Sequence, residues 1–231
     1  MELITSLIAI TLRAGTSLVY ATIGETYTER AGILNLGLEG IMLMGAVSSF
    51  ATAYYTGSLA LAIVVALVVG GFMALIHAFL SVTMKANQVV SGLSITLFGT
   101  GFASFLGQRL GPESNGFYLV GLTGPRFIAL DVGALADVPI LGALLNQDLF
   151  TYGVYLIIPL AWFYLYRTKN GLWLRAIGEN PRTADAMGVN VNRAKYGYTV
   201  FGGMLTAFGG AHLALAYTPG WSENITGGRG W

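Results

Sequence analysis

Long apolar runs separated by a few short polar stretches dominate the chain. No Asp, Glu, Lys or Arg occurs from residue 40 to residue 84, and a polar break at residues 54–58 divides that run. Since a helix needs about 20 apolar residues to cross roughly 30 Å of hydrocarbon, each such run is long enough for a span. The pattern predicts membrane spans at residues 31–54, 59–83, 86–108, 149–166 and 196–222.

The first apolar segment, residues 3–23, is interrupted by Arg13. We expect it to be a further span, with an interfacial helix as the alternative. The sequence therefore predicts an all-α integral membrane protein with about six transmembrane helices, in a single domain covering residues 1–231.

The composition agrees with a membrane protein. Charged residues make up 10% of the chain, hydrophobic residues 55%, and 32 of 231 residues are Gly, which is far from the balance of a soluble domain. The absence of Cys excludes disulfides and thiolate metal sites, and we expect no metal site. No cleavable signal follows Met1, so the first span is expected to direct insertion.

Basic residues gather in one loop, which sets the orientation. Residues 167–195 contain six Lys or Arg against Glu179 and Asp185, so this loop is expected in the cytoplasm. Residues 109–148 are acidic on balance and suit the outer side. Alternation then places the N-terminus outside, with Arg30 and Lys85 inside. Because the basic residues flank the membrane and form no continuous stripe, a nucleic-acid partner is not expected.

The basic loop also carries the signals of a short helix. Asn180 followed by Pro181 fits an N-cap and the first helical position, and Gly188 suits the end of the helix. A helix of about seven residues, 181–187, is unstable alone because nucleation outweighs so few hydrogen bonds. It should therefore dock on a partner's groove, and a connector lying on its own membrane domain is the alternative.

Two separated motifs resemble a known family. "ERAGILNLGLEGIMLMGA" and "RAIGENPRTADAMGVNVNRAKY" resemble the permease subunits of bacterial ABC importers for nucleosides, ribose and other simple sugars, and branched-chain amino acids. The wording of the first motif is closest to the nucleoside and simple-sugar type. The resemblance covers essentially the whole chain and implies a multi-pass protein of the bacterial inner membrane.

The resemblance implies a complex of several subunits with separate roles. This subunit would be no enzyme and hold no cofactor, and a cytoplasmic ATPase would bind ATP and Mg²⁺. A second permease, identical or homologous, and an extracytoplasmic substrate-binding protein would complete the importer. Residues 167–196 would be the coupling loop, with contacts to the ATPase from Arg175, Glu179, Asn180, Pro181, Arg182, Asp185, Met187 and Gly188.

Two features of the chain bear on this resemblance. No Lys follows a Gly, so the phosphate-binding G-x-x-x-x-G-K-[ST] loop is missing and the ATPase must be a separate chain. Family members usually carry further spans after the segment that corresponds to residues 228–230. The resemblance therefore implies that the last spans of the whole protein lie beyond Trp231.

Asn35 and Glu39 are unusual polar residues in a predicted span. They are four apart and would share one helical face, with Glu39 about 15 Å from Glu29 at about 1.5 Å per residue. A charge near the midplane normally faces a protein interior or a water-filled cavity. We hypothesise that both residues line or brace the transport pathway, and a structural hydrogen bond to a neighbouring helix is the alternative. Glycines at 32, 37 and 40 are expected to allow close helix packing.

Other polar residues are weaker candidates. Gln88, Ser91 and Ser94, flanked by Asn87 and Thr96, could form a pathway stripe, although Ser and Thr often bond their own helix carbonyls. His77 and His212 are expected to be neutral, packed and hydrogen-bonded. The pathway prediction thus names Asn35, Glu39, Gln88, Ser91 and Ser94. One flat packing face is predicted for Gly202, Gly203, Gly209 and Gly210.

The outer loop contains a further candidate helix. Residues 133–147 could form a short surface helix on the side where a binding protein would dock.

An ion-coupled secondary transporter would need buried charged pairs at discontinuous helices, and an intramembrane protease would need catalytic residues inside spans. We expect alternating access, with the 181–187 helix moved by the ATPase. A nucleoside is the first choice of substrate and a simple sugar the second.

Overall fold

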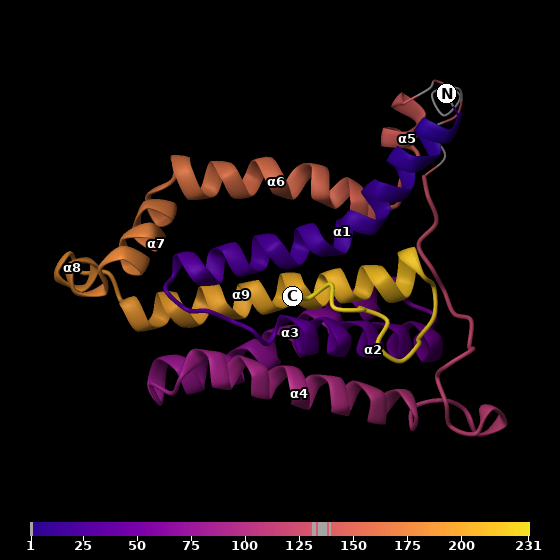
Figure 1. Cartoon of the computed structure of the whole chain (residues 1–231), viewed down its shortest axis with the longest axis horizontal. Helices are drawn as coiled ribbons and strands as arrows, with labels where there is room; N and C mark the ends of the chain where they lie inside the picture. Colours follow the sequence, from indigo (N-terminus) through magenta and orange to yellow (C-terminus); the bar gives the residue numbers. More distant parts are fainter. Residues whose placement is uncertain (1, 131–132, 134–137, 139) are drawn as a thin grey trace.

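The computed structural model describes residues 2–130, 133, 138 and 140–231, and in these ranges the chain is almost entirely helical. Its long helices lie side by side along one direction (Figure 1). π-Helical turns continue α3 over Phe79–Thr83 and α9 over Leu213–Tyr217. The α-helices are α1 (Glu2–Arg30), α2 (Leu38–Thr56), α3 (Leu59–Ala78), α4 (Gln88–Gly107), α5 (Leu141–Leu145), α6 (Leu149–Arg167), α7 (Lys169–Glu179), α8 (Pro181–Ala186) and α9 (Val191–His212).

Five helices in the described ranges are long and apolar enough to cross a membrane. They cover Leu3–Arg30, Leu59–Thr83, Gln88–Gly107, Leu149–Arg167 and Val191–Tyr217. The remaining long helix, α2, is enclosed by its neighbours, with most of its side chains buried. The predicted all-α membrane bundle is confirmed, with five spans and one inner helix in place of six equivalent spans.

The predicted boundaries are wrong at the start of the chain. Helix α1 continues to Arg30, beyond the predicted end at residue 23, and the predicted span 31–54 begins as helix only at Leu38. Gly32 has φ +76, a left-handed conformation that ends α1. The intervening residues are apolar, and hydrophobicity alone does not separate a buried extended segment from a buried helix.

Helix α9 lies at the centre and packs on three helices. A Cβ added to Gly202 would lie 2.3 Å from Thr28 Oγ1 in α1, and one at Gly210 would lie 2.0 Å from the carbonyl oxygen of Met42 in α2. A Cβ at Gly203 would lie 2.2 Å from Cβ of Ala74 in α3. The predicted close contacts are confirmed, but the single flat face is wrong, because consecutive glycines point about 100° apart around a helix.

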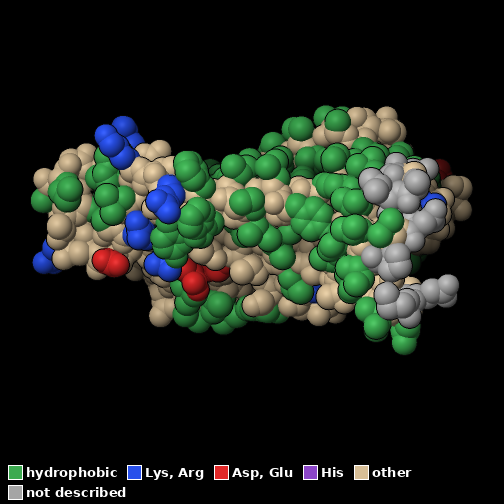
Figure 2. All heavy atoms as spheres, turned by 90° about the horizontal axis from the view of Figure 1, so that it is seen from above, with side chains coloured by type: hydrophobic (Ala, Val, Ile, Leu, Met, Phe, Trp, Pro, Cys, Tyr) green, Lys and Arg blue, Asp and Glu red, His purple; other side chains and the backbone are tan. Residues whose placement is uncertain are grey.

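The two ends of the bundle differ in charge. Figure 2 shows hydrophobic side chains over the length of the bundle and Lys and Arg gathered at the end formed by α7 and α8. At the opposite end the structure forms α5 over Leu141–Leu145, a smaller helix than the predicted 133–147, part of which lies outside the described residues. The assignment of the basic end to the cytoplasm stays a prediction from the charge rule.

Candidate functional site

Helix α8 has the end signals that the sequence indicates. Asn180 Oδ1 accepts a hydrogen bond from the backbone N–H of Thr183 at 3.2 Å, and Pro181 follows as the first helical residue. At the other end Gly188 takes φ +83, and the helix ends at Ala186, one residue earlier than predicted. These caps stabilise a helix of six residues that is far too short to persist alone.

Most of α8 is free of its own chain. Ala184 is 1% exposed and makes the inward contact, whereas Met187 is 72% exposed and Arg182 and Asp185 are also exposed. The helix contacts α7 and the start of α9 and lies at the far end of the molecule from α5 (Figure 1). Its exposed side chains therefore form a free surface beyond the bundle, and docking of a partner there stays a prediction.

Helix α7 joins α8 to the membrane bundle. It buries Leu174 and Ile177 on one face, and a Cβ added to Gly178 would lie 2.4 Å from the carbonyl oxygen of Arg30 at the end of α1. Glu179 is exposed, as a partner contact requires. The guanidinium of Arg175 lies over the ring of Tyr166 at 5.2 Å, within its own chain, and its contact with a partner stays a prediction.

An extended segment, residues 31–37, enters the bundle between α1 and α2. It leads from the basic end toward the middle of the molecule, where α2 begins (Figure 1). The predicted shared helical face of Asn35 and Glu39 is therefore wrong, because Asn35 precedes the helix that contains Glu39. Backbone that is not helical is tolerated at membrane depth only where protein or water satisfies its polar groups.

Side chains of α1 and α4 accept from the N–H groups of this segment. The N–H of Leu34 donates to Gln88 Oε1 at 2.8 Å, and the N–H of Asn35 donates to Glu25 Oε1 at 2.8 Å. Asn35 Oδ1 in turn accepts from the N–H of Gly37 at 2.9 Å. Gln88 and Asn35, both predicted pathway residues, thus hold the extended backbone in place.

Side chains of α3 and α4 bind the carbonyl groups. His77 Nε2 lies 3.1 Å from the carbonyl oxygen of Leu34, and its Nδ1 lies 3.0 Å from Ser91 Oγ. Thr96 Oγ1 donates to the carbonyl oxygen of Leu36 at 2.8 Å. Ser94 is exposed and donates to its own helix at Val90. The predicted polar stripe is therefore divided, with Ser91 turned toward the segment through His77 and Ser94 turned outward.

Glu39 binds the last described stretch of the chain. Its Oε1 accepts from Thr226 Oγ1 and from the N–H of Gly228 at 2.9 Å, and its Oε2 accepts from the N–H of Gly230 at 2.6 Å. The side chain is 5% exposed, and three donors offset the cost of burying a carboxyl group. Sequence spacing gave no signal for this contact, because the partners lie 187 to 191 residues away.

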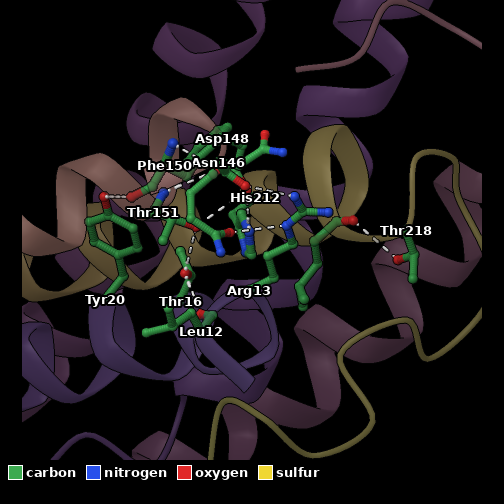
Figure 3. Close-up of polar contacts among 12 residues, drawn as sticks. Leu12, Arg13, Thr16, Tyr20, Asn146, Asp148, Phe150, Thr151, His212 and Thr218 are labelled. Atoms are coloured by element: carbon green, nitrogen blue, oxygen red, sulfur yellow. Dashed lines mark hydrogen bonds and ion pairs between the residues drawn. The ribbon is translucent and has the colours of Figure 1, made fainter. Parts of the chain in front are cut away.

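A second polar cluster lies at the end opposite α8 (Figure 3). Arg13 Nε donates to Gln147 Oε1 at 3.0 Å, which explains a basic residue within the first span. Asp148 Oδ1 caps α6 through the N–H of Thr151 at 3.0 Å. His212 Nε2 lies 3.8 Å from Asp148 Oδ2 without a hydrogen bond, so the prediction of a hydrogen-bonded His212 is wrong.

The environment of Asp148 lowers the pKa of its carboxyl group. Burial alone raises that pKa, but the neighbouring imidazole of His212 and the hydrogen bonds from Thr151 outweigh it. The ionised form is therefore favoured in the folded state. This cluster connects α1, α6 and α9, and its role is to stabilise their packing.

A bundle of apolar helices, an extended segment braced within it and a capped helix projecting from its basic end define a polytopic membrane protein. The chain belongs to the family described as branched-chain amino acid transport system / permease component, whose model matches residues 7–230.

Several relatives are membrane components of ABC transporters. TsgC13 of Haloferax volcanii, provisionally named a glucose ABC transporter permease protein, is 40% identical over all of this chain and 69% of its own length. The nucleoside ABC transporter permease protein NupC of Lactococcus lactis is 33% identical over 93% of this chain and 69% of its own. The guanosine ABC transporter permease protein NupQ of Bacillus subtilis is 28% identical over all of this chain and 73% of its own. No solved structure matches the chain.

These matches establish the class to which the chain belongs. It is a permease subunit of an ABC transport system and a multi-pass protein of the plasma membrane. Permease subunits are not catalytic themselves and work with an ATPase and a substrate-binding protein. The predicted family and the predicted transport role are confirmed.

Proposed function

We propose that the chain is the membrane-spanning subunit of an ATP-driven importer that moves a nucleoside or a related small polar solute by alternating access. Relatives named for nucleosides and guanosine support this substrate class. A simple sugar is the second candidate, because the relative with 40% identity is provisionally named for glucose.

The observation that carries the mechanism is the exposed surface of α8. A separate ATPase, which binds ATP and Mg²⁺, would take up α8 in a groove and contact Arg182, Asp185 and Met187. Because Gly178 packs on the end of α1, movement of α8 and α7 would reach the helices directly. ATP favours one state of the permease only through tighter binding of the ATPase to that state.

The remaining partners follow from the division of the molecule into two ends. A second permease subunit would face this one across the pathway, and a substrate-binding protein would deliver the solute at the end opposite α8. Residues 1–231 would form one permease domain, with loops 109–148 and 167–196 facing partners. In this proposal Asn35, Glu39, Gln88 and Ser91 brace the pathway, and Ser94 lies outside the braced region.

The test is reconstitution of the complete importer in proteoliposomes. Uptake of a labelled nucleoside or sugar should require ATP and continue when an ionophore dissipates ion gradients. The double variant Arg182→Glu, Met187→Asp should lose the ATPase in a pull-down, whereas Arg109→Glu at the opposite end should retain it. Uptake that ignores ATP and stops with the ionophore would identify an ion-coupled transporter instead.

A further inference from the structure

The extended segment, residues 31–37, is the short link between α7 and the enclosed helix α2. At its start, a Cβ added to Gly32 would lie 3.6 Å from the Cα of Gly178 in α7. At its other end α2 begins at Leu38, and most side chains of α2 are buried among the neighbouring helices. A displacement of α7 can therefore reach the interior of the bundle through this segment.

Side chains of α4 fix the middle of the segment. The N–H of Leu34 donates to Gln88 Oε1 at 2.8 Å. Thr96 Oγ1 donates to the carbonyl oxygen of Leu36, also at 2.8 Å. The backbone lies directly on α4, since a Cβ added to Gly92 would lie 2.6 Å from the backbone nitrogen of Leu36. The segment and the first half of α4 thus form one packed unit.

His77 of α3 binds both the segment and α4. It is 0% exposed, its Nε2 lies 3.1 Å from the carbonyl oxygen of Leu34, and its Nδ1 lies 3.0 Å from Ser91 Oγ. Residues 84–87 join the π-helical end of α3 to α4, so His77 and Ser91 face each other across a hairpin. π-Helical turns are frequent at functional sites. His77 is thus a single side chain that contacts three elements.

The contacts determine which ring nitrogen of His77 carries the hydrogen. A carbonyl oxygen can only accept, so Nε2 donates to Leu34. A buried charge costs much free energy without an acidic partner, and among the described residues the one ion pair that includes a histidine is that of His212. The ring is therefore uncharged, and its Nδ1 accepts from the hydroxyl of Ser91. A side chain at this position must supply a donor toward the segment and an acceptor toward α4.

We infer that His77 is a positioning residue for transport, which holds the segment and the hairpin of α3 and α4 together so that they move as one body. The inference rests on the proposed function, in which α8 and α7 deliver the movement that the ATPase produces. With His77 in place, a displacement at Gly178 shifts Leu34 and both helices of the hairpin together. Without it, the segment shifts alone, and ATP hydrolysis is no longer matched by movement of solute.

The test measures the solute imported per ATP hydrolysed by the assembled importer in proteoliposomes, with labelled nucleosides and labelled glucose as probes. His77→Leu leaves the carbonyl group of Leu34 without its donor, and we expect the ratio to fall about tenfold. His77→Gln keeps an amide donor toward Leu34 and should stay within about threefold of the wild type. Ser91→Ala removes the bond to Nδ1 and should lower the ratio about threefold.

Ser94→Ala is the matched control, because it makes the same change as Ser91→Ala about one turn further along α4. Ser94 is exposed, lies outside the loops that face partners and donates to the carbonyl oxygen of Val90 in its own helix. Its ratio should equal that of the wild type. All variants are compared as purified, assembled complexes, so reduced folding does not enter the ratio.

A wild-type ratio in assembled His77→Leu would overturn the inference and leave His77 as a packing residue. Equal ratios for His77→Leu and His77→Gln would overturn it as well, because the donor would then be irrelevant. If His77→Leu does not assemble, the inference fails when Ser91→Ala and Ser94→Ala give the same ratio. Failure of the wild type to import any probe, or import without ATP, would instead contradict the proposed function.

Discussion

The backbone of Gly178 in α7 rests directly on that of Arg30 at the end of α1, with only 2.4 Å between the carbonyl oxygen of Arg30 and the place of a Cβ on Gly178. A side chain of any size would separate the two helices. We therefore expect Gly178→Ala to lower stability by about 1–3 kcal/mol, as overpacking does, and to reduce ATP-dependent uptake. Thermal unfolding in detergent and uptake in proteoliposomes measure the two effects.

Gly197→Ala is the matched control for this variant. Gly197 lies within α9 and has no atom within 4 Å of its Cβ position, so Ala should be tolerated or stabilise the helix by up to about 1 kcal/mol. Equal uptake by the Gly178→Ala and Gly197→Ala proteins would show that the contact between α7 and α1 carries no coupling.

Gln88 and Ser94, both predicted to lie on one polar stripe, should respond differently to substitution. Gln88→Leu leaves the partly buried N–H of Leu34 without its acceptor, which costs about 1–3 kcal/mol. Ser94→Ala removes an exposed bond within α4 and should change stability by less than about 0.5 kcal/mol. Denaturation midpoints of the two variants, measured side by side, check this difference. Similar midpoints would contradict the bracing role of Gln88.

Glu39 should control the local order of the segment that it binds. In Glu39→Gln, one oxygen is replaced by an amide donor facing the N–H groups of Gly228 or Gly230. We expect the amides of residues 226–230 to exchange hydrogen at least tenfold faster, because their opening would no longer break bonds to a carboxylate.

Hydrogen exchange followed by mass spectrometry of the peptide containing these residues measures the effect. The same peptide in the Glu113→Gln protein should exchange at the wild-type rate. If exchange in Glu39→Gln were unchanged, the carboxyl group would not hold this segment.

The lowered pKa of Asp148 makes the stability of the end of the bundle opposite α8 depend on pH. Its pKa lies below the ordinary 3.8 in the folded state, so the folded state binds its proton less readily than the unfolded state does. The stabilisation is fully present above about pH 4 and is lost as pH falls through the lower folded-state pKa.

Asp148→Asn removes this contribution while it keeps an oxygen that can cap α6. The difference in Tm between wild type and variant should be constant from pH 7 to pH 5 and shrink below about pH 4. A difference that grows on acidification would show that the pKa shift has the opposite sign.

The helices of the bundle can be predicted well from the sequence, because each depends on a local property, a continuous run of apolar residues. Uninterrupted apolar runs must be helical in lipid, and α4, α6 and α3 with its π-helical turn begin and end within two residues of the predicted spans. The ends of α8 could be predicted equally well, because Asn180 and Pro181 at its start and Gly188 at its end each act on the adjacent turn of the helix. The helix within loop 167–196 can therefore be predicted from the sequence without knowledge of its tertiary contacts.

The polar contacts inside the bundle could not be placed in this way. Residues 33–37 are apolar enough for a helix, and only tertiary contacts with Gln88, His77 and Thr96 make an extended path possible there. The contact of Glu25 cannot be predicted from the sequence, because its partner in the segment is a backbone N–H, which does not depend on residue type. An acidic residue within an apolar helix was the one signal available for it.

The extended segment also constrains how the protein is made. As the chain emerges from the ribosome, residues 31–37 reach the bilayer before α3 and α4 exist, so the acceptors and donors that those helices supply are still absent. The first hairpin therefore has no finished form of its own in lipid. Residues 31–37 can complete their hydrogen bonds only after α3 and α4 have entered the membrane.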